Sequence, residues 1–90
     1  MDTQLRIERK PETLSRYGLS RSTFHARIID GLIPPPISLG DRAVGFPSHE
    51  TDQVIAFMMA GKSKDEIRLL VEHLVEQRQR TLEEIASWNA

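Results

Sequence analysis

The chain has 90 residues, of which 39% are hydrophobic and 28% are charged, and it contains no cysteine. This length suits one small domain, and the composition is typical of a globular chain rather than a disordered one. The lack of cysteine excludes a disulfide framework and thiolate metal sites, and it fits a cytoplasmic location. No apolar run approaches the roughly 20 residues of a membrane span, and the polar N-terminus is typical of neither a signal peptide nor a membrane anchor.

The formal net charge is -1, whereas proteins that bind nucleic acids usually carry an excess of basic residues. The charges are unevenly distributed along the chain. Residues 1–46 contain seven basic and five acidic residues, and residues 47–90 contain five basic and eight acidic residues. The basic side chains therefore lean toward the first half, where any binding to nucleic acid is expected.

The first half begins with two short predicted helices. Residues 1–9 show no period and are expected to form a flexible arm. A short helix is predicted over residues 11–17, and Gly18 suits a helix end that needs a positive φ. Ser20 is a good N-cap for a second helix over residues 21–30. Two short helices joined by a tight turn are typical of a helix-turn-helix, although the spacing alone also fits plain structural packing.

A β-hairpin is predicted next. The three prolines at 34–36 exclude a helix there, and extended patterns follow at 37–39 and 43–46 with a turn at 40–42. An isolated hairpin is marginal in water, so it is expected to pack on the helices as a wing. Arg42 at its tip could reach DNA phosphate or the minor groove, although an arginine in a turn also fits plain solvation. The side chains expected to face inward are those of Ile37, Leu39, Val44 and Phe46.

The second half is predicted to consist of two helices. Ser48 is expected to cap a helix over 49–60, whose buried stripe contains Val54, Phe57 and Met58. A long fourth helix is predicted over 64–87, because Ser63 and Glu66 have capping-box spacing. Its later part has more apolar surface than a solvated tail needs and is expected to fold back on the core or to pair with a second chain. The candidate residues for such oligomerisation are Leu82, Ile85 and Trp88.

No constellation of catalytic or metal-binding residues is found in the sequence. His25, His49 and His73 fall in three different predicted helices and do not form a ligand pair with metal-binding spacing. Nucleophile elbows, phosphate-cradling glycine loops and dinucleotide fingerprints are also absent. The chain is therefore predicted not to be an enzyme and to need no cofactor and no metal.

One stretch of the chain resembles a known family. The helix entry Gly-Leu-Ser-Arg-Ser-Thr at 18–23, the Gly-x-x-Pro-x-Pro exit at 31–36 and the segment Leu-Gly-Asp-Arg-Ala-Val-Gly-Phe at 39–46 resemble those of the AlpA-like prophage regulators. These proteins belong to a wider group of excisionase-like and MerR-like winged helix proteins. The resemblance runs without a gap through about 33 residues and implies a winged helix-turn-helix that binds double-stranded DNA.

The resemblance also implies which residues contact DNA. The second helix would enter the major groove, with Ser20 to Thr23 at the start of the recognition helix, and Arg42 would be the arginine of the wing. His25 stands where the family often has an aromatic residue, and Ala26 stands where a basic residue is common; both departures concern the sequence recognised. The residues predicted to bind DNA are Ser20, Arg21, Ser22, Thr23, His25, Arg27 and Arg42.

Together these observations predict a mainly helical protein with a small β-hairpin. The expected organisation is a flexible arm at 1–9, a winged helix-turn-helix domain at 10–62 and a helix within 63–90 that completes the core. The family contains both transcriptional regulators and excisionases that direct DNA recombination, and the sequence does not separate these roles. The alternatives are a protein-interaction module that binds a response regulator or an integrase, and a phage packaging or replication-initiator subunit.

Overall fold

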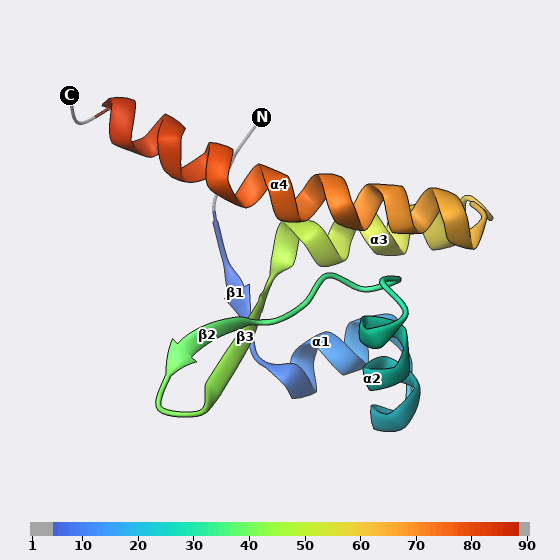
Figure 1. Ribbon diagram of the computed structural model, residues 1–90. Coiled ribbons are helices and arrows are strands. Elements are labelled where there is room, and N and C mark those ends of the chain that lie inside the picture. Colours follow the sequence, from blue (N-terminus) through green and yellow to red (C-terminus); the bar gives the residue numbers. More distant parts are fainter. Residues whose placement is uncertain (1–4, 89–90) are drawn as a thin grey trace.

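The computed structural model describes residues 5–88, and the side chains of residues 5–87. Within this part, the chain forms four helices and a small antiparallel sheet with strand order β1-β3-β2 (Figure 1). The elements are β1 (Ile7–Glu8), α1 (Lys10–Tyr17), α2 (Arg21–Ile29), β2 (Ile37–Gly40), β3 (Ala43–Pro47), α3 (Ser48–Met59) and α4 (Lys64–Trp88). The predicted mainly helical fold with a hairpin is confirmed, and the succession of α1, a tight turn and α2 is consistent with a helix-turn-helix.

The strand β1 is the element that the sequence did not predict. Residues 1–9 are expected to form a flexible arm, but Ile7 and Glu8 within that range pair with Pro47 and Phe46 of β3. The backbone amide of Ser48 also donates a hydrogen bond to the carbonyl oxygen of Arg6 at 2.8 Å. The segment just before α1 is therefore fixed to the sheet.

Two of the four hairpin residues expected to face inward lie on the other face of the sheet. Val44 packs against the core and Phe46 is buried within it, as predicted. Ile37, however, pairs with Gly45, so its side chain lies on the opposite face of the sheet from Val44 and Phe46. Leu39 is also on the outside, with 43% of its surface exposed. The prediction that Ile37 and Leu39 face inward is wrong, because register decides which face a strand residue occupies.

The helix ends follow mostly from the signals in the sequence. Gly18 ends α1 with φ +68°, and the Ser20 hydroxyl accepts a hydrogen bond from the backbone amide of Thr23 at 3.2 Å. At α4, Ser63 and Glu66 form the predicted reciprocal capping box, with both bonds at 3.2 Å, and the bonds from Ser63 lower the pKa of Glu66. Ser48 is not a cap: it is the first residue of α3, and Pro47 precedes it as N-cap.

The core lies between α4 and the other helices. Phe24 of α2 is fully buried and stacks edge-on against Phe46, with 5.2 Å between ring centroids. Val54 of α3 is also fully buried, as its predicted stripe requires. From α4 the core receives Ile67, Leu70, Val71 and Leu74. These contacts fix the orientation of α2, because the side of the helix that bears Phe24 must face the core.

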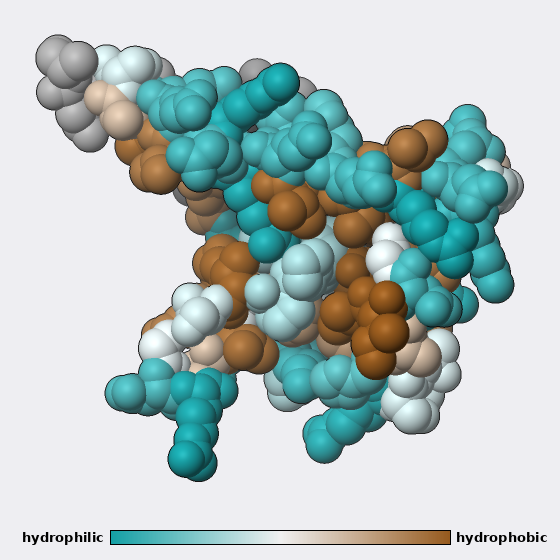
Figure 2. Space-filling model, in the orientation of Figure 1, coloured by the Kyte–Doolittle hydropathy of each residue, from teal (hydrophilic) through white to brown (hydrophobic). Residues whose placement is uncertain are grey.

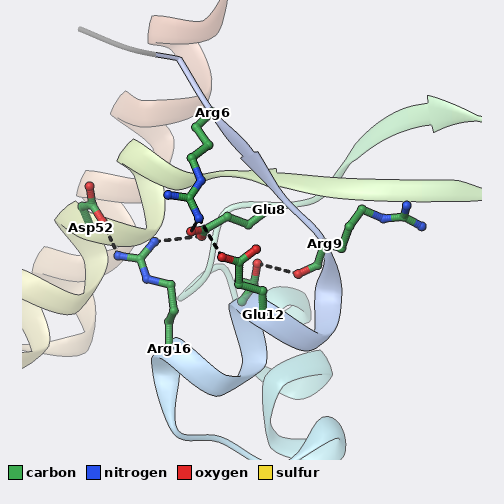
Figure 3. Close-up of polar contacts among 7 residues, drawn as sticks. Arg6, Glu8, Arg9, Glu12, Arg16 and Asp52 are labelled. Carbon is green, nitrogen blue, oxygen red and sulfur yellow. Dashed lines mark hydrogen bonds and ion pairs between the residues drawn. The ribbon is translucent and has the colours of Figure 1, made fainter. Parts of the chain in front are cut away.

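Two buried carboxylates tie distant segments together. The Glu50 carboxylate is 1% exposed and accepts bonds from Arg78 Nε at 2.8 Å and Nη2 at 2.7 Å, while the same Nη2 donates to the carbonyl oxygen of Pro35. Buried Glu8 accepts a bond from Arg16 at 2.8 Å, and Arg16 also pairs with Asp52 (Figure 3). The first pair joins α3 to α4 and the proline segment, and the second joins β1 to α1 and α3. The bonds to Asp52 and Glu8 raise the pKa of Arg16.

The helix α4 continues well past the core. It crosses one side of the molecule, and its C-terminal part extends beyond the other elements instead of folding back on them (Figure 1). Among the helices described, α4 included, none is long and apolar enough to cross a membrane.

Candidate functional site

The outward face of α2 is the first part of the candidate site. Because Phe24 anchors the opposite side, residues spaced by three and four along the helix turn to solvent together. This face consists of Ser22, His25, Ala26 and Ile29, all of which are exposed, with Ile29 at 85%. Short and apolar side chains therefore dominate the centre of the face, and the exposed side chain of Arg21 stands at its edge.

Two of the predicted contact residues are engaged within the helix itself. The Ser20 hydroxyl accepts the bond from the Thr23 amide and donates a bond to Thr23 Oγ1 at 2.9 Å. These contacts satisfy the start of α2. His25 Nε2 lies 3.3 Å from Lys10 Nζ, which brings the start of α1 next to the face of α2.

Arg27 lies apart from the other predicted residues of α2. Its side chain is half-buried and lines a shallow hollow together with Lys64 and Ile67 of α4. It is therefore placed on the flank of α2 near the start of α4, and not among the residues of the outward face.

The tip of the β2–β3 hairpin is the second part of the site. Gly40 pairs with Ala43, so Asp41 and Arg42 form a two-residue turn between them. Both turn residues have positive φ, +37° and +67°, which is the conformation of the primed turns that usually carry Asn-Gly or Asp-Gly. Arg42 thus occupies a backbone position that favours glycine, and its side chain is exposed.

The pairing of charges separates two kinds of basic residue. Within residues 5–87, ion pairs with carboxylates involve Arg6, Arg16, Lys62, Arg68 and Arg78. The first half also contains basic side chains with no carboxylate within 4.0 Å in that part of the chain. These are Arg9, Lys10, Arg21, Arg27 and Arg42.

These five cations occupy the start of α1, α2 and the hairpin tip. Figure 3 shows the Arg9 guanidinium directed away from the neighbouring network of ion pairs. In Figure 1, α2 and the hairpin tip both project away from α4. Hydrophilic atoms cover the projecting hairpin tip in Figure 2. The carboxylates of α4 that lack a basic partner within residues 5–87 are those of Glu72, Glu76, Glu83 and Glu84.

This separation explains how a chain with net charge -1 presents a basic surface. Carboxylates neutralise the arginines of the ion pairs, and two of them, Glu8 and Glu50, are buried. Of the other carboxylates in the described residues, Asp30 and Asp41 lie at the end of α2 and in the hairpin turn, and the rest lie on α4. The side that bears α2 and the hairpin keeps its positive charge available for a ligand.

Sequence reasoning missed four residues of this surface. Arg9 belongs to the predicted arm, and Lys10 stands just before the first predicted helix. The sequence does not show that neither forms an ion pair with a carboxylate, because ion pairs depend on the fold. Ala26 and Ile29 are not among the residues predicted to bind DNA, although both lie off the side of α2 that carries Phe24. The spacing of Ser22, His25, Ala26 and Ile29 is the signal that identifies this face.

The oligomerisation candidates lie at the far end of α4. Leu82 is exposed at 59%, and Ile85 is half-buried. The side chain of Trp88 lies outside the described residues. None of these positions is near α2 or the hairpin tip, since the C-terminal end of α4 extends away from both (Figure 1).

Comparison with known proteins gives two matches. Residues 6–59 match the family model described as "Prophage CP4-57 regulatory protein (AlpA)", so the match covers β1 through α3 and stops before α4. The chain is also similar to "Uncharacterized protein ORF88" of Enterobacteria phage P4, with 39% identity over 62 residues, which is 69% of this chain and 70% of that protein. No solved structure matches the chain.

Proposed function

The chain belongs to the AlpA family of prophage regulatory proteins, and from this premise we propose that it regulates by binding a specific sequence of double-stranded DNA. The observation that carries the proposal is that Arg9, Lys10, Arg21 and Arg42 have no carboxylate partner within residues 5–87 and lie at the start of α1, at the start of α2 and at the hairpin tip. A surface of this kind supplies the phosphate contacts on which protein–DNA affinity depends.

In the proposed complex, α2 lies in the major groove as the recognition helix. An arginine at the start of such a helix can bind the O6 and N7 atoms of guanine, and Arg21 has the position and the free charge for this contact. Ser22 and His25 supply shorter polar contacts. Ala26 and Ile29 present methyl groups, which match the C5-methyl group of thymine. We therefore propose a recognised site that combines guanine near Arg21 with thymine near Ile29.

The hairpin acts in this proposal as a wing on the backbone or in the minor groove beside α2. A non-glycine residue with positive φ costs roughly 1–2 kcal/mol of conformational energy. Arg42 has this unfavourable conformation at the tip of the hairpin, where it makes no ion pair within residues 5–87. In the proposed complex, a contact with phosphate offsets the conformational energy. Arg9 and Lys10 extend the phosphate contacts to the start of α1.

Both roles proposed for the protein, transcriptional regulator and excisionase, use this one surface. We propose that it works in the cytoplasm without a catalytic step, and that an integrase or another regulator is its protein partner. Phosphate contacts fix the register of the protein on DNA, and α2 reads the sequence.

The experiment is a binding titration with the variants Arg21→Ala and Arg80→Ala. Arg21→Ala is expected to weaken binding to the specific site by about 1–3 kcal/mol, which is roughly 5- to 150-fold, and to weaken binding to unrelated DNA much less. Arg80→Ala removes an exposed arginine from α4 and is the matched control, with affinity close to that of the unaltered protein. Equal losses in the two variants would contradict the placement of α2 in the major groove.

A further inference from the structure

The outer face of the sheet, the one turned away from the core, is apolar. Ile7 pairs with Pro47 and Ile37 pairs with Gly45, so these four residues share that face. A methyl group added at Gly45 would collide with Ile7 Cγ2 and would lie 3.0 Å from Leu39 Cδ1. The side chains of Ile7 and Leu39 therefore close over Gly45 from the two neighbouring strands. The outer sheet face is defined here as Leu5, Ile7, Ile37, Leu39 and Pro47.

A hollow of about 220 Å³ separates this face from α4. From the sheet side it is lined by Leu5, Ile7, Ile37 and Pro47, and from α4 by Arg78 and Thr81. Hydrophobic atoms are visible in the recess between α4 and the hairpin in Figure 2. Of the large hydrophobic side chains that are exposed in the described chain, those of Leu5 and Ile7 line this hollow.

The part of α4 beside the hollow lies beyond the last core residue of the helix and is held there by the bonds from Arg78 to Glu50 and Pro35. Leu74 is the last buried residue of α4, and residues 75–88, called here the α4 extension, continue the helix for roughly 21 Å at 1.5 Å per residue. The core-facing stripe continues along the extension as Arg78, Thr81 and Ile85, with the exposed Leu82 beside it. A helical segment of this length is marginal in water unless its apolar stripe is covered.

We propose that the outer sheet face and the α4 extension form an interface between two copies of this chain. The extension of each protomer lies against the outer sheet face of the other, so that one surface meets itself about a two-fold axis. The outer sheet face is apolar, and the extension contributes the apolar side chains of Leu82 and Ile85 beside Thr81. At the edge of the hollow, Arg6 pairs with Glu12 and still keeps 64% of its side chain exposed. At the edge of the extension, Glu84 flanks the stripe and has no basic partner within residues 5–87. These opposite charges are brought together when the extension enters the partner's hollow.

Dimerisation is measured in the absence of DNA, so its outcome is independent of the proposed DNA binding. The measurement is sedimentation equilibrium of the full chain from 1 to 200 μM. The unaltered protein is expected to dimerise reversibly, and Leu82→Glu is expected to raise the dimer dissociation constant at least tenfold. Leu69→Glu is the matched control: Leu69 is exposed at 66% on the opposite side of α4, and its replacement is expected to leave the dissociation constant unchanged.

Two further variants test the edge of the interface. Glu84→Lys is expected to weaken the dimer about two- to five-fold, whereas Glu83→Lys, on the side of the extension away from the stripe, is expected to leave it unchanged. A chain that stays monomeric at 200 μM would overturn the proposal, as would equal effects of the replacements at 82 and 69.

The lack of natural cysteine allows a direct test of which surfaces meet. When tagged Leu5→Cys protein is mixed with untagged Leu82→Cys protein and oxidised, a disulfide between the two chains is expected. A mixture of Leu5→Cys with Leu69→Cys is expected to give no such product. A dimer that forms without the first cross-link, or with both, would show that other surfaces meet.

Discussion

At the hairpin tip, Arg42 is expected to lower the stability of the protein while it strengthens DNA binding. Arg42 has φ +67°, and relieving this conformation with glycine recovers roughly 1–2 kcal/mol. Glycine also gives the unfolded chain more freedom, which costs about 0.4–1 kcal/mol. Arg42→Gly is therefore expected to stabilise the protein by about 0.5–1 kcal/mol, which raises Tm by roughly 2–8 °C for a domain of this size.

The same replacement removes a proposed phosphate contact. The logarithm of the DNA affinity falls linearly with the logarithm of salt concentration, with a slope of about 0.9 for each phosphate contacted. Arg42→Gly is thus expected to reduce this slope by about one and to weaken binding similarly for all sequences. Thermal unfolding followed by circular dichroism measures the first effect, and fluorescence anisotropy at several salt concentrations measures the second.

Arg42→Ala separates the two effects. Alanine removes the charge but keeps the unfavourable backbone conformation, so the salt slope is expected to fall while Tm does not rise. A glycine variant that is no more stable than the alanine variant would refute the argument from φ. A salt slope equal to that of the unaltered protein in both variants would refute the phosphate contact.

Three further predictions concern the core and the α2 face. Arg78→Ala leaves the buried Glu50 carboxylate without its guanidinium partner and is expected to lower the free energy of unfolding by about 3–5 kcal/mol in urea titrations. The double replacement Glu50→Leu with Arg78→Met removes both charges and is expected to lower the free energy of unfolding far less. Burial raises the pKa of Tyr17 to about 12, above its usual value near 10, so stability is full below pH 10 and falls by about 2–3 kcal/mol as pH rises to 12. Tyr17→Phe is expected to lack this fall, apart from the ionisation of other groups common to both proteins. Replacing thymine with uracil in the bound site is expected to weaken DNA binding by the unaltered protein but not by the Ile29→Ala variant. Equal weakening of binding in both proteins would contradict the contact proposed for Ile29.

Local signals were sufficient to predict the helices of this fold. A glycine with positive φ, a serine cap and a capping box act within a few residues, so Gly18, Ser20 and the Ser63–Glu66 pair could be read directly from the sequence. The boundaries of all four helices lie within a residue or so of those expected.

The sheet could not be predicted in the same way, because its geometry depends on pairing between distant segments. The strand β1 has two residues and no pattern of its own, and it exists because β3 lies beside it. The irregularity between Ser38 and Gly40 and the pairing of Ile37 with Gly45 set the faces of β2. Alternation alone placed Ile37 and Leu39 on the wrong side.

The sequence predicts where the candidate site lies but not which of its charges are unpaired. The start of α2 and the hairpin tip were identified from the resemblance, and the structure places both on one side of the molecule, away from α4. Which arginines are free depends on pairs such as Glu50 with Arg78, which are 28 residues apart. A net charge of -1 counts both members of such pairs and therefore underestimates the positive charge available at the surface.

Binding of the unaltered protein to DNA shows whether this chain recognises a specific sequence. The protein would be titrated into duplex fragments tiled around its own gene and the nearest integrase gene, with fluorescence anisotropy recorded at two salt concentrations. The proposed function predicts that one fragment binds far more tightly than the others and that its affinity falls as salt rises. Equally weak binding to every fragment would contradict sequence-specific DNA recognition by α2 and the hairpin.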